Sequence, residues 1–156
     1  MAHNRIIKSF YSDGLLKIAK VIKSSQYGEF CGTARCNPDD EPNAWDGQKI
    51  AERRCDIAIQ KAKAKDYQSR LKGMKHLQAI LHDKFNDDKD YYTIGMIEVL
   101  DELDHQVKIM ERQTKNQITF SNNLKNGFND YVNFLQTTRA KVRARAEALK
   151  DAKNKE

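Results

Sequence analysis

The residues best suited to carry out chemistry are carboxylates that lie close together in the sequence. They are Asp39, Asp40, Glu41, Asp46 and Glu52. Neighbouring carboxylates can hold magnesium ions for phosphodiester cleavage, so Asp39, Asp40 and Glu52 are the candidate centre of a metal-dependent nuclease. Acidic side chains also stabilise the positive N-terminal end of a helix, and these stand where a helix is expected to begin. We favour the helix-capping interpretation and keep the nuclease as an alternative.

The cysteine and histidine residues have no spacing typical of a metal site. The chain contains Cys31, Cys36 and Cys55, together with His3, His76, His82 and His105. Neither a Cys-x-x-Cys pair nor a His-Glu-x-x-His motif occurs. The odd number of cysteines also argues against a disulfide framework. Because the glycines are isolated and no nucleophile motif is present, we predict no metal ion, no cofactor and no catalytic residue, and hence a protein that is not an enzyme.

Basic side chains crowd the C-terminal part of the chain. The formal net charge is +6 and the pI is about 9.2, a balance that favours an acidic or polyanionic partner. The cations of this region are Arg139, Lys141, Arg143 and Arg145, with Lys150 beyond them. They are either the solvated flanks of a coiled coil or a surface for nucleic acid or an acidic protein. The sequence alone leaves both interpretations open.

Three aromatic residues stand near expected helix starts, where a partner can reach them: Trp45, Tyr91 and Tyr92. Aromatic and arginine side chains are common anchors of protein interfaces. We therefore join these aromatics with the four cations from Arg139 to Arg145 as the predicted partner-binding residues. Few aromatics are placed to stack on bases, so a protein partner ranks above RNA or DNA.

The segments that must position these residues differ between the two halves of the chain. Short β-prone runs at 5–11, 15–23 and 29–35 are separated by turn signals at Ser12–Gly14 and Ser24–Gly28, which predicts a three-stranded antiparallel meander. The segment 15–23 also fits a helical period, so a helix there is the alternative. A helix is predicted from near Asn43 through the sixties, a second at 67–85 that can also be a continuation of the first, and a third from near Tyr91.

The last helical stretch carries apolar side chains at alternating three- and four-residue spacing. They are Phe128, Tyr131, Leu135 and Val142, with Thr138 between the last two. Such spacing is typical of a coiled coil. The seam pairs either within the chain or with a second copy, and a homodimer is the simpler prediction.

These elements give an α+β fold class: a small three-stranded antiparallel meander packed on a helix, followed by long C-terminal helices with coiled-coil-like packing. The predicted domains are a strand-and-helix part at 1–66, a helical part at 67–150 and a frayed tail at 151–156. The sequence has neither a signal-peptide pattern nor an apolar run long enough to cross a membrane. We expect a cytoplasmic protein with no membrane partner.

A motif spans the third predicted strand and the start of the first predicted helix. It reads Gly32-Thr33-Ala34-Arg35-Cys36-Asn37-Pro38-Asp39-Asp40, followed by Gly47 and Ile50-Ala51-Glu52-Arg53. It resembles the pattern Gly-x-Ala-x-Cys-x-Pro-x-Asp, then glycine, then Ala-x-x-Arg, in small hypothetical proteins of phages of Gram-positive bacteria. The resemblance covers about residues 5–62. It implies a phage or prophage origin and, because no activity is known for that family, it implies no site residues.

Small phage proteins often act by stoichiometric binding to a host protein, and anti-CRISPR inhibitors are one such group. By this analogy we expect a non-enzymatic protein that binds a host protein or ribonucleoprotein, for instance to inhibit a host defence nuclease, in the host cell cytoplasm. Binding of RNA or DNA by the basic C-terminal helix is the alternative. The metal-dependent nuclease is the second alternative.

Overall fold

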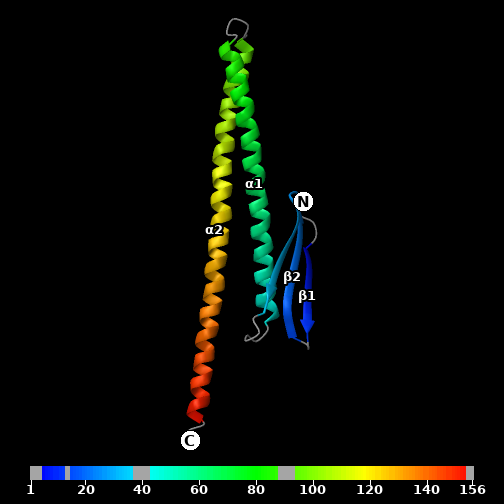
Figure 1. Cartoon of the computed structure of the whole chain (residues 1–156), viewed down its shortest axis with the longest axis vertical. Helices are drawn as coiled ribbons and strands as arrows, with labels where there is room; N and C mark the ends of the chain where they lie inside the picture. The colour runs from blue at the N-terminus through cyan, green and yellow to red at the C-terminus, as the bar shows by residue number, and fades with distance from the viewer. Residues whose placement is uncertain (1–4, 13–14, 37–42, 88–93, 154–156) are drawn as a thin grey trace. The chain divides into compact units, whose positions relative to one another are not determined.

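The computed structural model describes residues 5–12, 15–36, 43–87 and 94–153. Along the chain these form strand β1 (Arg5–Ser12), strand β2 (Leu15–Ser25), strand β3 (Gly28–Arg35), helix α1 (Ala44–Asp87) and helix α2 (Ile94–Lys153), as shown in Figure 1. Neither helix has a stretch that is long and apolar enough to cross a membrane.

The strands form an antiparallel sheet in the order β1-β2-β3. The β2–β3 turn is closed by Ser25, whose hydroxyl oxygen lies 3.2 Å from the Tyr27 backbone nitrogen and 3.3 Å from the Gly28 carbonyl oxygen. Gly28 has a φ of +119°, a conformation that a residue without a Cβ adopts readily. Residues 15–23 belong to β2, so the strand prediction is confirmed over its helical alternative.

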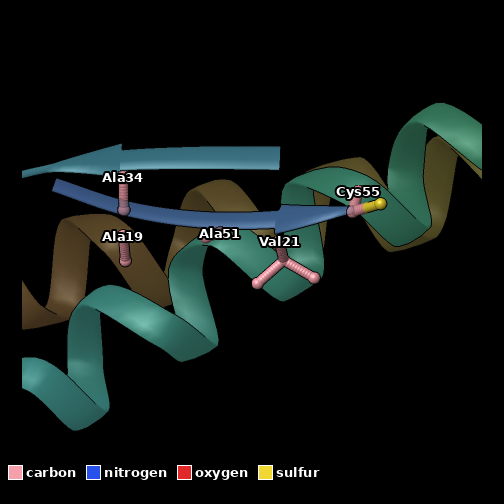
Figure 2. Packing of buried hydrophobic residues seen from close by; sticks show 5 residues of the cluster. All are labelled: Ala19, Val21, Ala34, Ala51 and Cys55. Atoms are coloured by element: carbon pink, nitrogen blue, oxygen red, sulfur yellow. The ribbon is translucent and has the colours of Figure 1, made fainter. Parts of the chain in front are cut away.

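The sheet packs on α1 through small side chains. The buried cluster consists of Ala19, Val21, Ala34, Ala51 and Cys55, and Figure 2 shows them between the strands and the helix. Gly32 lies at the point of closest approach. A Cβ built there would stand 1.8 Å from the Ala51 carbonyl oxygen and 2.7 Å from the Cys55 backbone nitrogen. The small residues Gly32 and Ala34 therefore let α1 lie close to the sheet.

Polar contacts hold the rim of this sheet–helix interface. Lys23 of β2 forms ion pairs with Asp56 and, at 3.4 Å, with Glu52, both on α1. Arg54 donates a hydrogen bond of 2.6 Å to the Thr33 carbonyl oxygen of β3. These bonds join both strands to the first four turns of α1.

Helix α1 begins where the sequence predicted. The side-chain oxygen of Asn43 accepts hydrogen bonds from the backbone N–H groups of Trp45 (3.0 Å) and Asp46 (3.2 Å), which satisfies amides that have no partner inside the helix. From Ala44 the helix runs for 44 residues without interruption. The prediction that 67–85 continues the first helix is thus the one that the structure shows.

The described part of α1 and the α2 residues up to Ser121 pack side by side in opposite directions. Gln78 of α1 bonds to Asp104 of α2 at 2.9 Å, whereas Gln60, earlier in α1, bonds to Gln117, later in α2, also at 2.9 Å. The earlier residue of α1 contacts the later residue of α2, so the two helices are antiparallel. Helix α2 has 60 residues and continues without interruption through Asn126 and Gly127.

The predicted fold class needs correction, although the α+β description holds. We expected a strand-and-helix module followed by separate long C-terminal helices, but the helix under the sheet is itself one of two long helices that dominate the described residues. The reason is local: nothing in 61–72 interrupts helical hydrogen bonding, and Gly73 alone does not end a helix. The domain limit proposed at residue 66 falls inside α1.

The chain divides into two units, residues 1–121 and residues 122–156. The first holds the sheet, α1 and the first part of α2. The second holds the remainder of α2, and its described residues are helical to Lys153.

Candidate functional site

The proposed nuclease carboxylates are only partly within the described residues. Asp39 and Asp40 lie outside them. Glu52 is half-buried on α1 and pairs with Lys23, so its carboxylate contributes to the sheet–helix interface. In the part of the chain that the structure describes, no three His, Cys, Asp or Glu side chains stand close enough together to hold a metal ion. Asp46 lies in the first turn of α1, where a carboxylate interacts favourably with the helix dipole.

The three cysteines are free and lie in different environments. Cys31 is exposed, Cys36 is half-buried and Cys55 is buried. The Cys55 thiol lies 3.2 Å from the Phe30 carbonyl oxygen, and burial raises the pKa of this thiol above its ordinary value. A protonated thiol is a poor nucleophile, so Cys55 acts as a small core residue.

A histidine–carboxylate contact joins the two helices. The Nε2 atom of His82 on α1 lies 2.8 Å from Oδ1 of Asp104 on α2, and Gln78 donates to the same oxygen. Hydrogen bonds from His82 and then from Gln78 lower the pKa of Asp104 below its ordinary value. The contact with His82 was missed because it depends on the antiparallel register of two helices.

The helix–helix interface contains a buried polar layer that apolar patterning also missed. On α2 the seam alternates three- and four-residue steps through Leu100, Leu103, Val107, Met110, Thr114, Gln117 and Ser121. Its last three members are polar, yet their exposed fractions are only 4%, 9% and 5%. Gln117 bonds to Gln60 across the interface, while Thr114 Oγ1 is buried without a hydrogen-bond partner in the described residues. The three- and four-residue spacing continues through these polar residues and could have indicated their burial, but the prediction considered apolar residues alone.

Of the three predicted aromatic anchors, Trp45 lies within the described residues. Its side chain is 60% exposed at the start of α1, and Lys49 Nζ lies 3.3 Å from the centre of its ring. A cation over an indole ring is a stabilising contact. Tyr91 and Tyr92 lie outside the described residues.

The predicted dimerisation residues differ in their exposure. Phe128 is buried, Tyr131 and Leu135 are half-buried, and Val142 is 64% exposed. Burial along this face of α2 thus ends between Leu135 and Val142, although the spacing of the apolar residues continues. Pairing of two copies through these four residues stays a prediction.

The predicted cations lie in the segment of α2 where burial ends. Arg139 is half-buried, and every residue from 140 to 150 is exposed. We call residues 139–150 the C-terminal segment. It carries five cations and one acid, Glu147. Its large apolar side chains, Val142 and Leu149, are exposed by 64% and 60% and lie seven residues apart.

The helical period sorts these side chains around the C-terminal segment. Residues seven apart lie on one face, so Val142 and Leu149 form a stripe with Ala146 between them. Lys141 and Arg145, four residues apart, flank one side of this stripe. Arg139, Arg143 and Lys150 flank the other side. The face opposite the stripe carries Ala140, Ala144 and Glu147.

Comparisons of this chain with protein-family models, curated proteins and solved structures found no match.

Proposed function

We propose that this chain is a non-catalytic binding protein and that the C-terminal segment of α2 is its surface for a partner macromolecule. One observation carries the proposal: the apolar and basic pattern of the helix continues for three turns after burial has ended. Exposure of an apolar stripe to water is unfavourable. An exposed apolar patch with polar or charged residues around it marks an interaction surface.

The remaining polar side chains support a scaffold rather than an active site. Lys23 and Asp56 tie the sheet to α1, while His82 and Asp104 tie α1 to α2. Each of these contacts holds two elements of the fold together. The contacts of the first unit hold the fold together, and residues 140–150 of α2 are exposed, which suits a stoichiometric partner.

The resemblance of residues 32–53 to small phage proteins supports a partner in a bacterial host. In this proposal the chain occupies a host protein or ribonucleoprotein, inhibits or recruits it, and works in the host cytoplasm. Inhibition of a defence nuclease is one form of this role. Nucleic acid is the alternative partner, favoured by the five cations of the C-terminal segment.

The proposal is tested by capture and titration. Full-length protein and the Lys141→Ala/Arg145→Ala variant are used to capture proteins from a Gram-positive lysate, and each captured protein is then purified and titrated. We expect a complex at a fixed ratio that the variant loses. Magnesium-dependent cleavage of RNA or DNA that disappears in Asp40→Asn would establish the nuclease alternative instead.

A further inference from the structure

The C-terminal segment combines two features that a polyanion does not require together. Phosphate groups are recognised by positive charge, and an apolar stripe adds nothing to that contact. Here Val142 and Leu149 stand exposed between two rows of cations. A partner that uses both features has its own apolar stripe with acidic side chains on each side.

Such a partner is an amphipathic helix. When two helices pack by heptads, residues at every seventh position form the seam and the flanking positions carry the charges that choose the partner. In α2 this arrangement already exists upstream, where Leu100, Val107 and Thr114 are buried seven residues apart. Val142 and Leu149 lie at later steps of the same series.

The charge of the C-terminal segment decides against a second copy of this chain along Val142 and Leu149, and therefore against the Val142 end of the predicted homodimer seam. Two copies packed along this stripe would bring Lys141 and Arg145 of one copy against a second set of cations. Like charges at flanking positions destabilise a coiled coil, whereas glutamates there would pair with them. Twelve residues of helix span about 18 Å, enough for about three turns of contact.

From this placement we infer that the C-terminal segment binds an acidic amphipathic helix of a partner protein, in heptad register along Val142 and Leu149. The inference rests on the proposed function and names the chemical class of the partner. Specificity comes from the cations on both flanks, and the apolar stripe supplies the contact that excludes water.

The test uses the full-length protein and a synthetic three-heptad peptide with leucine at the seam and glutamate at the flanking positions. A second peptide with lysine at the flanking positions controls for non-specific helix contact. Fluorescence anisotropy of the labelled peptides is measured at two salt concentrations. We expect saturable binding of the glutamate peptide at a ratio of one to one, weakened by salt, with at least tenfold weaker binding of the lysine peptide.

Matched variants separate the stripe from the net charge. Lys141→Ala/Arg145→Ala removes two positive charges beside the stripe, whereas Ala140→Glu/Ala144→Glu lowers the net charge equally on the opposite face. We expect the first to weaken binding of the glutamate peptide by tenfold or more and the second by less than threefold. Equal losses would overturn the inference, because they would show attraction to overall charge.

A second pair of variants tests the apolar contact without changing charge. Val142→Ser/Leu149→Ser should weaken binding of the glutamate peptide by tenfold or more, and Ala140→Ser/Ala144→Ser should leave it nearly unchanged. Circular dichroism of all variants checks that the helix is retained. A duplex DNA or single-stranded RNA bound more tightly than the glutamate peptide, and equally by the Val142→Ser/Leu149→Ser variant, would overturn the inference in favour of nucleic acid. A stable dimer that disappears in that variant would overturn it in favour of a second copy.

Different results would refute the acidic-helix inference and the proposed function. A lysate partner that binds the C-terminal segment while the glutamate peptide does not would refute the acidic helix and leave the binding role standing. If neither the peptide nor any lysate partner depends on Lys141 and Arg145, both the acidic helix and the proposed function fail.

Discussion

The absence of a side chain at one residue sets the distance between the sheet and α1. Gly32 faces the Ala51 carbonyl and the Cys55 backbone at separations that no Cβ tolerates. This is a packing requirement, since Gly32 has no positive φ that would call for glycine. The Gly-x-Ala pattern of β3 therefore has a structural explanation that is independent of any family resemblance.

Gly32→Ala should destabilise the protein strongly. The new methyl group would meet helix backbone, which cannot turn aside as a flexible side chain can. Overpacking of this kind costs about 1–3 kcal/mol and sometimes more. Gly73→Ala is the matched control, because nothing lies within 4 Å of a Cβ there and alanine favours a helix by about 0.5–1 kcal/mol over glycine. Thermal unfolding followed by circular dichroism should show opposite shifts, and a neutral Gly32→Ala would contradict the close approach.

A second prediction at the residue scale concerns the buried hydroxyl of Thr114. A buried polar atom without a partner costs about 1–3 kcal/mol, so Thr114→Val should raise the unfolding temperature. Gln117→Leu in the same layer should lower it, because that change leaves the Gln60 amide without its 2.9 Å bond. Opposite signs in thermal melts would support this account. A loss of stability in both variants would show that Thr114 has a polar role.

At the scale of the elements, the two helices are joined by a seam that is apolar near the α1–α2 connection and polar further along. The polar layer buries less apolar surface than leucine would, but the hydrogen bond between Gln117 and Gln60 forms in the alignment that brings these two residues together. Polar residues at seam positions often fix the register of a helix pair in this way. The His82–Asp104 contact lies beside the apolar part of the same seam.

Asp104 should make the stability of the helix pair depend on pH in the acidic range. Its folded-state pKa is lowered by hydrogen bonds from His82 and Gln78, so the ionised carboxylate stabilises the folded chain at pH values above its ordinary pKa of 3.8. That contribution is lost as pH falls through the lowered folded-state pKa. Between about pH 5 and pH 2, the unfolding temperature should fall less steeply in Asp104→Asn than in the wild type. Equal slopes for Asp104→Asn and the wild type would refute the role of Asp104.

The sequence predicts the helices and strands better than it predicts how they pack on one another. The strands follow from β-prone runs between turn signals, and the start of α1 follows from Asn43. The number of helices does not follow, because a helix without a breaker and two helices with a short link have the same local pattern. Thr114, Gln117 and Ser121 look like a solvated stretch until α1 covers them. The His82–Asp104 contact could not be predicted from spacing within either helix.

At the scale of the whole molecule, the folded core and the predicted binding surface occupy separate stretches of sequence. The sheet and α1 meet through residues 19–56, and the α1–α2 hydrogen bonds Gln78–Asp104 and Gln60–Gln117 lie within the unit 1–121. Residues 140–150 are exposed throughout. The candidate binding cations could be predicted from composition, whereas the end of burial before Val142 could not, because apolar spacing continues on both sides of it.

This separation predicts that the end of α2 can be removed without unfolding the protein. A chain ending at Thr138 loses the five cations and the exposed stripe but keeps every buried seam position of α2. All described residues that it loses are exposed except the half-buried Arg139, so we expect its unfolding temperature to stay within a few degrees of that of the full chain. Its complex with the titrated partner should be abolished. A chain ending at Lys150 is the control, since it keeps the whole C-terminal segment and should bind as the full chain does. Partner binding that persists in the chain ending at Thr138 would move the interface to another surface, with Trp45 as the first residue to test.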